Sequence, residues 1–165
     1  MKKRKGFTLI ELLIVIGIIA VLMSIAIVAI NPGRQFAKAN NARRWGDVSA
    51  IVDAISIRVI EEKGNWNPPA GCEVLPTDGV AHPLAYDGPG AGDDANVDIC
   101  SCIVTEYIGT MPLDPTDGTA PTAPPCTGYD TGYEITGTTT GRIKISAPTI
   151  QEEGPGTPTE ISVTR

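Results

Sequence analysis

A single carboxylate, that of Glu11, lies inside an apolar stretch that carries no other charge. The stretch runs for 24 residues from Phe7 to Ile30 and contains no proline. An acid within a membrane-spanning segment costs roughly 2–3 kcal/mol, so it calls for a cationic partner. Cleavage of the chain between Gly6 and Phe7 would supply one, because the new amino group would stand four residues before Glu11. Residues four apart share a face of a helix, and the amine of a neighbouring chain could serve equally well.

The segment that must position this carboxylate is a membrane-spanning helix. As an α-helix, residues 7–30 would be about 36 Å long, enough for a hydrocarbon core of about 30 Å. A secretory signal peptide is one alternative, with Ser24-Ile25-Ala26 as its cleavage site. Its apolar region is usually shorter and has no acid. A plain single-pass anchor is the other alternative.

The residues around this carboxylate resemble a known processing site. The motif Lys5-Gly6-Phe7-Thr8-Leu9-Ile10-Glu11 with its apolar continuation closely resembles that of type IV pilins and type II secretion pseudopilins. The resemblance implies that a prepilin peptidase removes residues 1–6 by cutting after Gly6, and that Phe7 is then methylated. It also implies that Glu11 meets the terminal amine of an adjacent subunit during assembly.

The resemblance further implies where the chain resides and what it assembles with. Before assembly the chain crosses the cytoplasmic membrane once, with its C-terminal domain outside. It then joins a helical homopolymer on the cell surface, through an assembly motor and platform proteins of the inner membrane. The function expected is therefore that of a structural pilin, with no enzymatic activity. The alternatives are a pseudopilin of a type II secretion or DNA-uptake system and a membrane-anchored binding or enzymatic domain that never polymerises.

The charge of the chain is unevenly distributed. After the expected cut, 9 lysines and arginines face 19 acids, a net charge of −10. A chain this acidic is not expected to bind nucleic acid by counterion release. Its negative charge is expected to keep the surface of a filament soluble. Four cations nevertheless gather just beyond the apolar stretch: Arg34, Lys38, Arg43 and Arg44. They are interpreted as a solvated helix face, a contact with anionic lipid headgroups, or a contact with acids of a neighbouring subunit.

A second helix is expected beyond the apolar one, over residues 33–62. Pro32 predicts a kink between the two, because its ring would clash with the carbonyl four residues earlier. An apolar stripe at helical spacing predicts one buried face. The stripe consists of Trp45, Val48, Ile51, Val52, Ile55 and Val59.

Residues 63–165 are expected to form the exported globular domain, rich in loops. Alternating apolar residues predict strands at 133–135 and 142–146, joined by a hairpin loop at 137–141, and an edge strand at 160–164. Asp98 is expected to cap a short helix over 99–108, and residues 64–97 are expected to be irregular. So small a sheet is marginal in water by itself. The prediction is therefore an α+β fold, with the long kinked helix packed against a small antiparallel sheet.

The exported part contains four cysteines: Cys72, Cys100, Cys102 and Cys126. An even number outside the cytoplasm predicts two disulfides. A bridge between Cys100 and Cys102 is disfavoured by its geometry, so each of them is expected to pair with one outer cysteine. A four-thiolate zinc site fits poorly with the long outer spacings, and free thiols require a reducing envelope.

Metal binding and catalysis have weaker signals. Asp94-Ala95-Asn96-Val97-Asp98 has the oxygen spacing of a calcium loop, but it lacks the glycine and the bidentate glutamate that such a loop requires. The resemblance to pseudopilins, which commonly hold calcium in a C-terminal loop, makes Asp114, Asp117 and Asp130 equal candidates. A nucleophile and base formed by Cys72 and His82 is disfavoured, since a disulfide would consume the thiol. No metal site and no catalytic residue is therefore predicted, and calcium is retained only as an open possibility.

Overall fold

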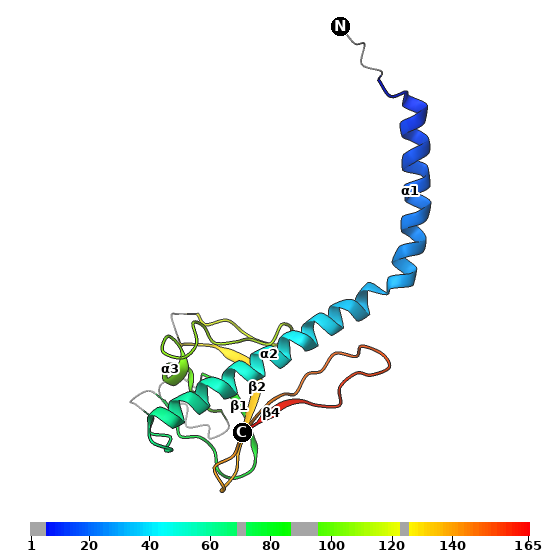
Figure 1. Cartoon of the computed structure of the whole chain (residues 1–165). Helices are drawn as coiled ribbons and strands as arrows, with labels where there is room; N and C mark the ends of the chain where they lie inside the picture. The colour runs from blue at the N-terminus through cyan, green and yellow to red at the C-terminus, as the bar shows by residue number, and fades with distance from the viewer. Residues whose placement is uncertain (1–5, 69–71, 87–95, 123–125) are drawn as a thin grey trace.

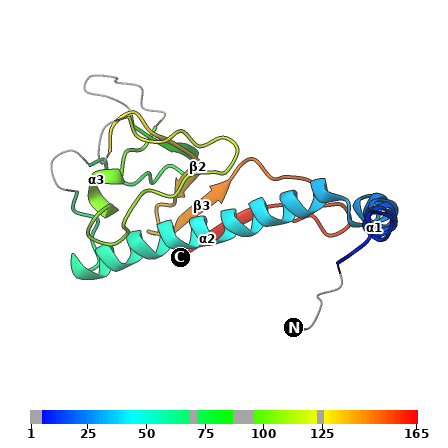
Figure 2. The ribbon, with the colours of Figure 1, turned by 90° about the horizontal axis from the view of Figure 1, so that it is seen from above.

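The architecture is that of a long, broken helix with a small domain at one end. The computed structural model describes residues 6–68, 72–86, 96–122 and 126–165. The helix α1 (Leu9–Ile30) extends away from the domain as an isolated rod, and α2 (Pro32–Glu61) crosses the domain (Figure 1). Viewed along α1, α2 runs along one edge of the domain: β2, β3 and α3 lie on one side of it, and the red C-terminal strand overlaps it (Figure 2). The predicted α+β fold is confirmed.

The bend between the helices is a complete break. Asn31 ends α1 in a left-handed conformation (φ 46°), and Pro32 occupies the first turn of α2. Proline fits there because the first helical N–H groups have no intrahelical acceptor in any case. The residue before a proline is also disfavoured in the right-handed helical region, so the helix stops one residue earlier than a kink at Pro32 would require.

Four antiparallel strands form one sheet in the order β1-β2-β3-β4. They are β1 (Ala81–Ala85), β2 (Asp130–Gly137), β3 (Ile143–Ala147) and β4 (Ile161–Thr164). The strands predicted from alternation are confirmed as β2, β3 and β4, and β4 lies at the edge. Strand β1 falls within a region expected to be irregular. Its five residues include Pro83, which interrupts the alternating pattern and which only an edge strand tolerates.

The core lies between α2 and one face of the sheet. On the helix, Val48, Ile51, Val52 and Ile55 are at most 1% exposed. On the sheet, every second residue of β2 is buried, as the two-residue period of a strand requires. The facing sheet residues are Tyr133, Ile135, Ile145 and Ile161. The inclusion of Trp45 in the buried stripe is wrong: it is 41% exposed, because the buried face is centred on Val48 and Ile55 and Trp45 lies at its margin.

The short helix and the cysteines complete the domain. Helix α3 (Cys100–Ile103) is shorter than the expected 99–108, because Val104 is extended and Thr105 has a left-handed backbone (φ 74°). Asp98 accepts a hydrogen bond from the N–H of Cys100 at 3.1 Å. Two disulfides are present, Cys72–Cys102 and Cys100–Cys126, as the expected pattern allowed. They exclude the zinc and free-thiol alternatives.

Candidate functional site

The candidate cleavage point lies outside regular structure. Gly6, Phe7 and Thr8 precede α1 and are not helical. Phe7 is 90% exposed, and a side chain placed on Gly6 would meet no atom within 4 Å. The peptide bond between Gly6 and Phe7 is therefore not covered by the described part of the chain.

Thr8 and Glu11 hold the start of α1 through a capping box. The carboxylate Oε2 of Glu11 accepts hydrogen bonds from the N–H of Thr8 (2.9 Å) and from its hydroxyl (2.8 Å). In return, the Thr8 hydroxyl accepts from the N–H of Glu11 at 3.3 Å. Two backbone N–H groups that an isolated helix end leaves unpaired are satisfied in this way. In the uncut chain, the Glu11 carboxylate therefore caps the N-terminal end of α1.

The role of Thr8 was not anticipated from the sequence, although its signal is present. Threonine followed three residues later by glutamate, ahead of an apolar run, is the pattern of a capping box. Since α1 begins at Leu9, Phe7 lies before the helix, and the expected four-residue helical relation between Phe7 and Glu11 is not formed in the uncut chain. The pairing of Glu11 with an amine stays a prediction.

Helix α1 has the dimensions and composition of a membrane span. Residues Leu9–Ile27 form a candidate span with a mean hydropathy of 2.9, none of it buried against the rest of the chain. Its large apolar side chains are 45–83% exposed. So much exposed apolar surface requires a lipid or protein environment.

The basic residues beyond this span do not form one uniform face. Arg34, Lys38 and Arg43 are exposed, whereas Arg44 is completely buried. The Arg44 guanidinium donates to both carboxylate oxygens of Asp114, from Nε at 2.6 Å and from a terminal nitrogen at 3.0 Å. All three interpretations of the basic cluster are therefore wrong for Arg44, since its partner is an acid of its own chain.

Asp114 is held by more than this arginine. Its carboxylate also accepts from the N–H groups of Thr116 (2.8 Å) and Asp117 (3.1 Å). Burial opposes ionisation of Asp114, but the Arg44 guanidinium and the Thr116 N–H outweigh it and lower its pKa to about 2. Both oxygens of Asp114 thus serve this network, and they are not available as the calcium ligands considered above.

The other metal candidates are not drawn together either. Within the described ranges, no group of three or more His, Cys, Asp or Glu side chains could hold a metal ion. Asp130 accepts from the N–H of Gly132, and Asp94 lies outside the described residues. Cys72 is bonded to Cys102 and offers no thiolate to pair with His82. Calcium binding stays a hypothesis from the sequence.

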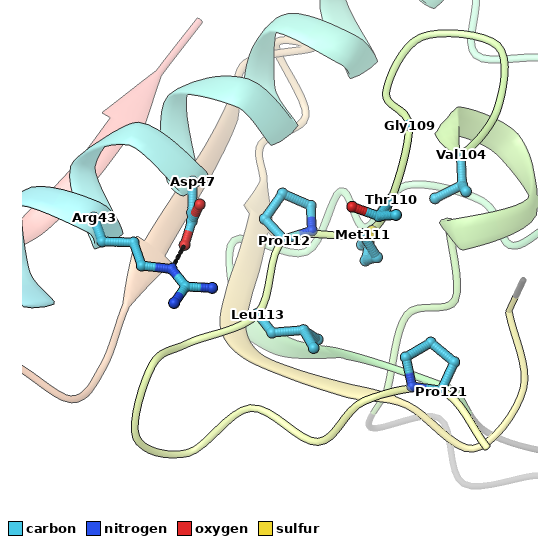
Figure 3. Close-up of a pocket in the computed structure, with 9 residues that line it drawn as sticks. All are labelled: Arg43, Asp47, Val104, Gly109, Thr110, Met111, Pro112, Leu113 and Pro121. Atoms are coloured by element: carbon cyan, nitrogen blue, oxygen red, sulfur yellow. Dashed lines mark ion pairs between the residues drawn. The ribbon is translucent and has the colours of Figure 1, made fainter.

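A cleft of about 670 Å³ separates α2 from the loop 104–121 (Figure 3). Its charged side chains, Arg43 and Asp47, point toward each other across 3.6 Å, and Asp47 also accepts from the Tyr133 hydroxyl at 2.9 Å. Burial and then Asp47 raise the pKa of Tyr133, so this hydroxyl keeps its proton. The rest of the lining is apolar or uncharged: Val104, Gly109, Thr110, Met111, Pro112, Leu113 and Pro121. The residues described around this cleft do not assemble a nucleophile with a base.

Comparison with known proteins bears on the N-terminal segment alone. Residues 1–27 match the family model of the prokaryotic N-terminal methylation motif. No curated protein and no solved structure matches the chain. The motif implies processing by a prepilin peptidase and supports a type IV pilin-like or pseudopilin precursor of a structural kind. Together with the open Gly6–Phe7 bond and the exposed apolar helix behind it, the match identifies residues 1–27 as a type IV prepilin-like signal.

Proposed function

We propose that the chain is the structural subunit of a type IV pilus-like extracellular filament. A prepilin peptidase cuts after Gly6 and Phe7 is methylated, and the subunit then leaves the membrane for the filament. The observation that carries the proposal is the methylation motif at the head of a helix whose candidate span, Leu9–Ile27, is not buried against any described part of the chain.

The physical argument begins with the apolar surface of α1. Each large apolar side chain removed from water contributes roughly 1.5–3 kcal/mol, so helices bundled in a filament core hold the fibre together. Before assembly, the bilayer keeps the same apolar side chains out of water. Removal of the leader takes away its four cations, so the helix can pass from lipid to filament without carrying that charge through an apolar medium.

Glu11 is proposed to set the register between subunits. Within an apolar bundle an unpaired carboxylate is penalised, so the arrangement that brings it to the amine of a neighbouring Phe7 is favoured. The capping box suits this role, because it keeps the carboxylate at the first turn of α1 until a subunit arrives.

The decisive experiment separates the charge of Glu11 from its capping role. In Glu11→Gln the side chain still caps the helix, since glutamine serves in a capping box, but it cannot form an ion pair. Thr8→Ala is the matched control, which disrupts the box and keeps the charge. We expect mass spectrometry to find methylated Phe7 at the N-terminus of both variants, and electron microscopy of sheared cells to find filaments only from Thr8→Ala.

Three results would contradict the proposal. Normal filament yield from Glu11→Gln would remove the register role of the charge. A native N-terminus other than Phe7, such as the lysine-rich leader or Ile27, would remove the processing step. Short filaments confined to the cell envelope would assign the subunit to a pseudopilus, the alternative that shares the same signal.

A further inference from the structure

The part of the chain nearest the apolar helix differs in charge from everything that follows it. Between Glu11 and Asp47 there is no acid, and the cations Arg34, Lys38, Arg43 and Arg44 lie within 13 residues of the break at Asn31. From Asp47 onward, 5 lysines and arginines face 18 acids, a net charge of −13. Positive charge is thus concentrated at the start of α2.

The break at Asn31 places this basic segment directly after the candidate membrane span. The candidate span ends at Ile27, and α2 begins at Pro32. In Figure 1, α2 leaves the axis of α1 at the break and runs obliquely from it, so its first turns stay near the level at which α1 ends. From Arg34 to Arg43 the helix advances by only about 14 Å.

The side chains of this segment are available to an outside partner. Phe36 is 70% exposed, and Arg34 and Lys38 are exposed on another side of the helix, because each is two positions from Phe36. Arg43 pairs with Asp47 at 3.6 Å, but its side chain is 59% exposed, and an ion pair so exposed is weak. Arg44, by contrast, is neutralised by Asp114 in the interior and takes no part.

We propose that the first turns of α2, residues 32–43, bind anionic phospholipid headgroups of the leaflet in which α1 ends. The proposal rests on the proposed function only for the orientation of the chain. A cation close to an anionic membrane surface contributes about fivefold to binding, so three exposed cations contribute about a hundredfold. An exposed aromatic side chain adds apolar contact at the headgroup level.

The acidic charge of the domain opposes its approach to an anionic membrane. A domain with a net charge of −13 beyond residue 46 is repelled by anionic headgroups within a Debye length, about 10 Å at 0.1 M salt. The acidic β3–β4 connection packs beside these turns: Glu153 accepts from Asn41 at 2.7 Å, and Gly154 lies against the Arg34 guanidinium. The cations of the first turns of α2 therefore have to offset this repulsion at the membrane surface.

A second copy of the chain is the competing partner, because its acids could also meet these cations. Charge alone does not separate the two partners. The position directly after the span and the exposed Phe36 favour the lipid. An aromatic side chain gains apolar contact at the headgroup level, whereas hydrated carboxylates offer it none.

The chain has a native probe for the test, because Phe36 is one of only two phenylalanines. The full uncut chain, labelled with 4-fluorophenylalanine, is placed as a monomer in lipid nanodiscs that contain a gadolinium-chelating headgroup. The discs are made of phosphatidylcholine alone or with added phosphatidylglycerol. We expect the ¹⁹F relaxation of Phe36, assigned with Phe36→Leu, to be enhanced severalfold more in the anionic discs and to lose that difference in 1 M salt.

Matched charge reversals identify the residues responsible. Arg34→Glu/Lys38→Glu should reduce the Phe36 relaxation in anionic discs to its value in neutral discs. Arg142→Glu/Lys63→Glu makes the same change of charge far from the span and should leave the relaxation unchanged. Equal relaxation in both lipids, or no effect of the first variant, would overturn the proposal.

Two further measurements separate this proposal from its rivals. The first is chemical cross-linking of neighbouring copies of the chain. If Arg34→Glu/Lys38→Glu keeps its lipid contact but no longer forms cross-linked copies, the cations contact a neighbouring subunit and the lipid proposal is wrong. The nanodisc measurement uses an uncut monomer, so it does not depend on filament growth. A methylated Phe7 and normal filaments with no lipid effect would therefore leave the proposed function intact while refuting the lipid surface.

Discussion

The buried ion pair between Arg44 and Asp114 joins α2 to the loop before β2, and its loss should be costly. Both side chains are 0% exposed, and the guanidinium meets the carboxylate through two hydrogen bonds. Arg44→Met would remove the charge and keep much of the apolar stem. The Asp114 carboxylate would then remain buried, with the N–H groups of Thr116 and Asp117 as its remaining backbone donors.

The expected cost follows from what stays behind. Removing one partner of a buried pair destabilises a protein by about 3–5 kcal/mol, because an uncompensated charge remains. Two backbone donors still serve the carboxylate here, so we expect about 3 kcal/mol for Arg44→Met. The double variant Arg44→Met/Asp114→Leu should cost less than the sum of its single changes, since it leaves no buried charge unpaired.

Urea unfolding of the full chain in detergent micelles, with its disulfides intact, measures this cost. Arg43→Met is the matched control, because its exposed pair with Asp47 should be worth no more than about 0.5 kcal/mol. A loss below about 1 kcal/mol for Arg44→Met, or one equal to that of the control, would refute the reasoning.

Acid should weaken the same contact in a defined range. The pKa of Asp114 is lowered from 3.8 to about 2 in the folded chain. A lowered pKa contributes stability that is complete above the unfolded value and is lost as the pH falls through the folded one. The difference corresponds to about 2 kcal/mol, lost between about pH 4 and pH 2. Arg44→Met should flatten this part of the stability profile, and an unchanged profile would assign the acid sensitivity to other carboxylates.

Three further substitutions test local features of the structure, each by its effect on the free energy of unfolding or on helicity. Gly137→Ala should destabilise the domain by about 3 kcal/mol in urea unfolding, because its Cβ would lie 1.7 Å from the carbonyl oxygen of Pro76; a neutral result would contradict this contact. Gly46→Ala, on the exposed face of α2 with no atom within 4 Å of the new Cβ, should stabilise by about 0.5–1 kcal/mol, and a loss of stability would show that this face is covered. Thr8→Ala should weaken the start of α1 by about 1 kcal/mol, seen as faster amide exchange up to Glu11, and unchanged exchange would argue against the capping box.

Much of the fold could be predicted because it depends on local periodicity. The apolar run gives α1, the stripe from Val48 to Val59 gives the buried face of α2, and alternation gives β2, β3 and β4. Strand β1 could not be predicted, because Pro83 breaks the alternating pattern of its residues. It forms by pairing with β2, about fifty residues later in the chain. The length of α3 could not be predicted either. The left-handed backbone that ends it is at Thr105, where no glycine marks such a turn in the sequence.

The sequence by itself determined the N-terminal signal, since its cleavage point, its span and its single acid lie within 27 contiguous residues. It also determined that the cysteines would pair, because their number and separation leave few arrangements. Only the tertiary structure decided which basic residues face outward: Arg44 looks like its neighbours in the sequence, yet its partner Asp114 lies 70 residues away. A side chain's charge follows from its type, but its surroundings follow from packing. That packing hides Arg44 within the domain and leaves Arg34, Lys38 and Arg43 exposed beside the membrane helix.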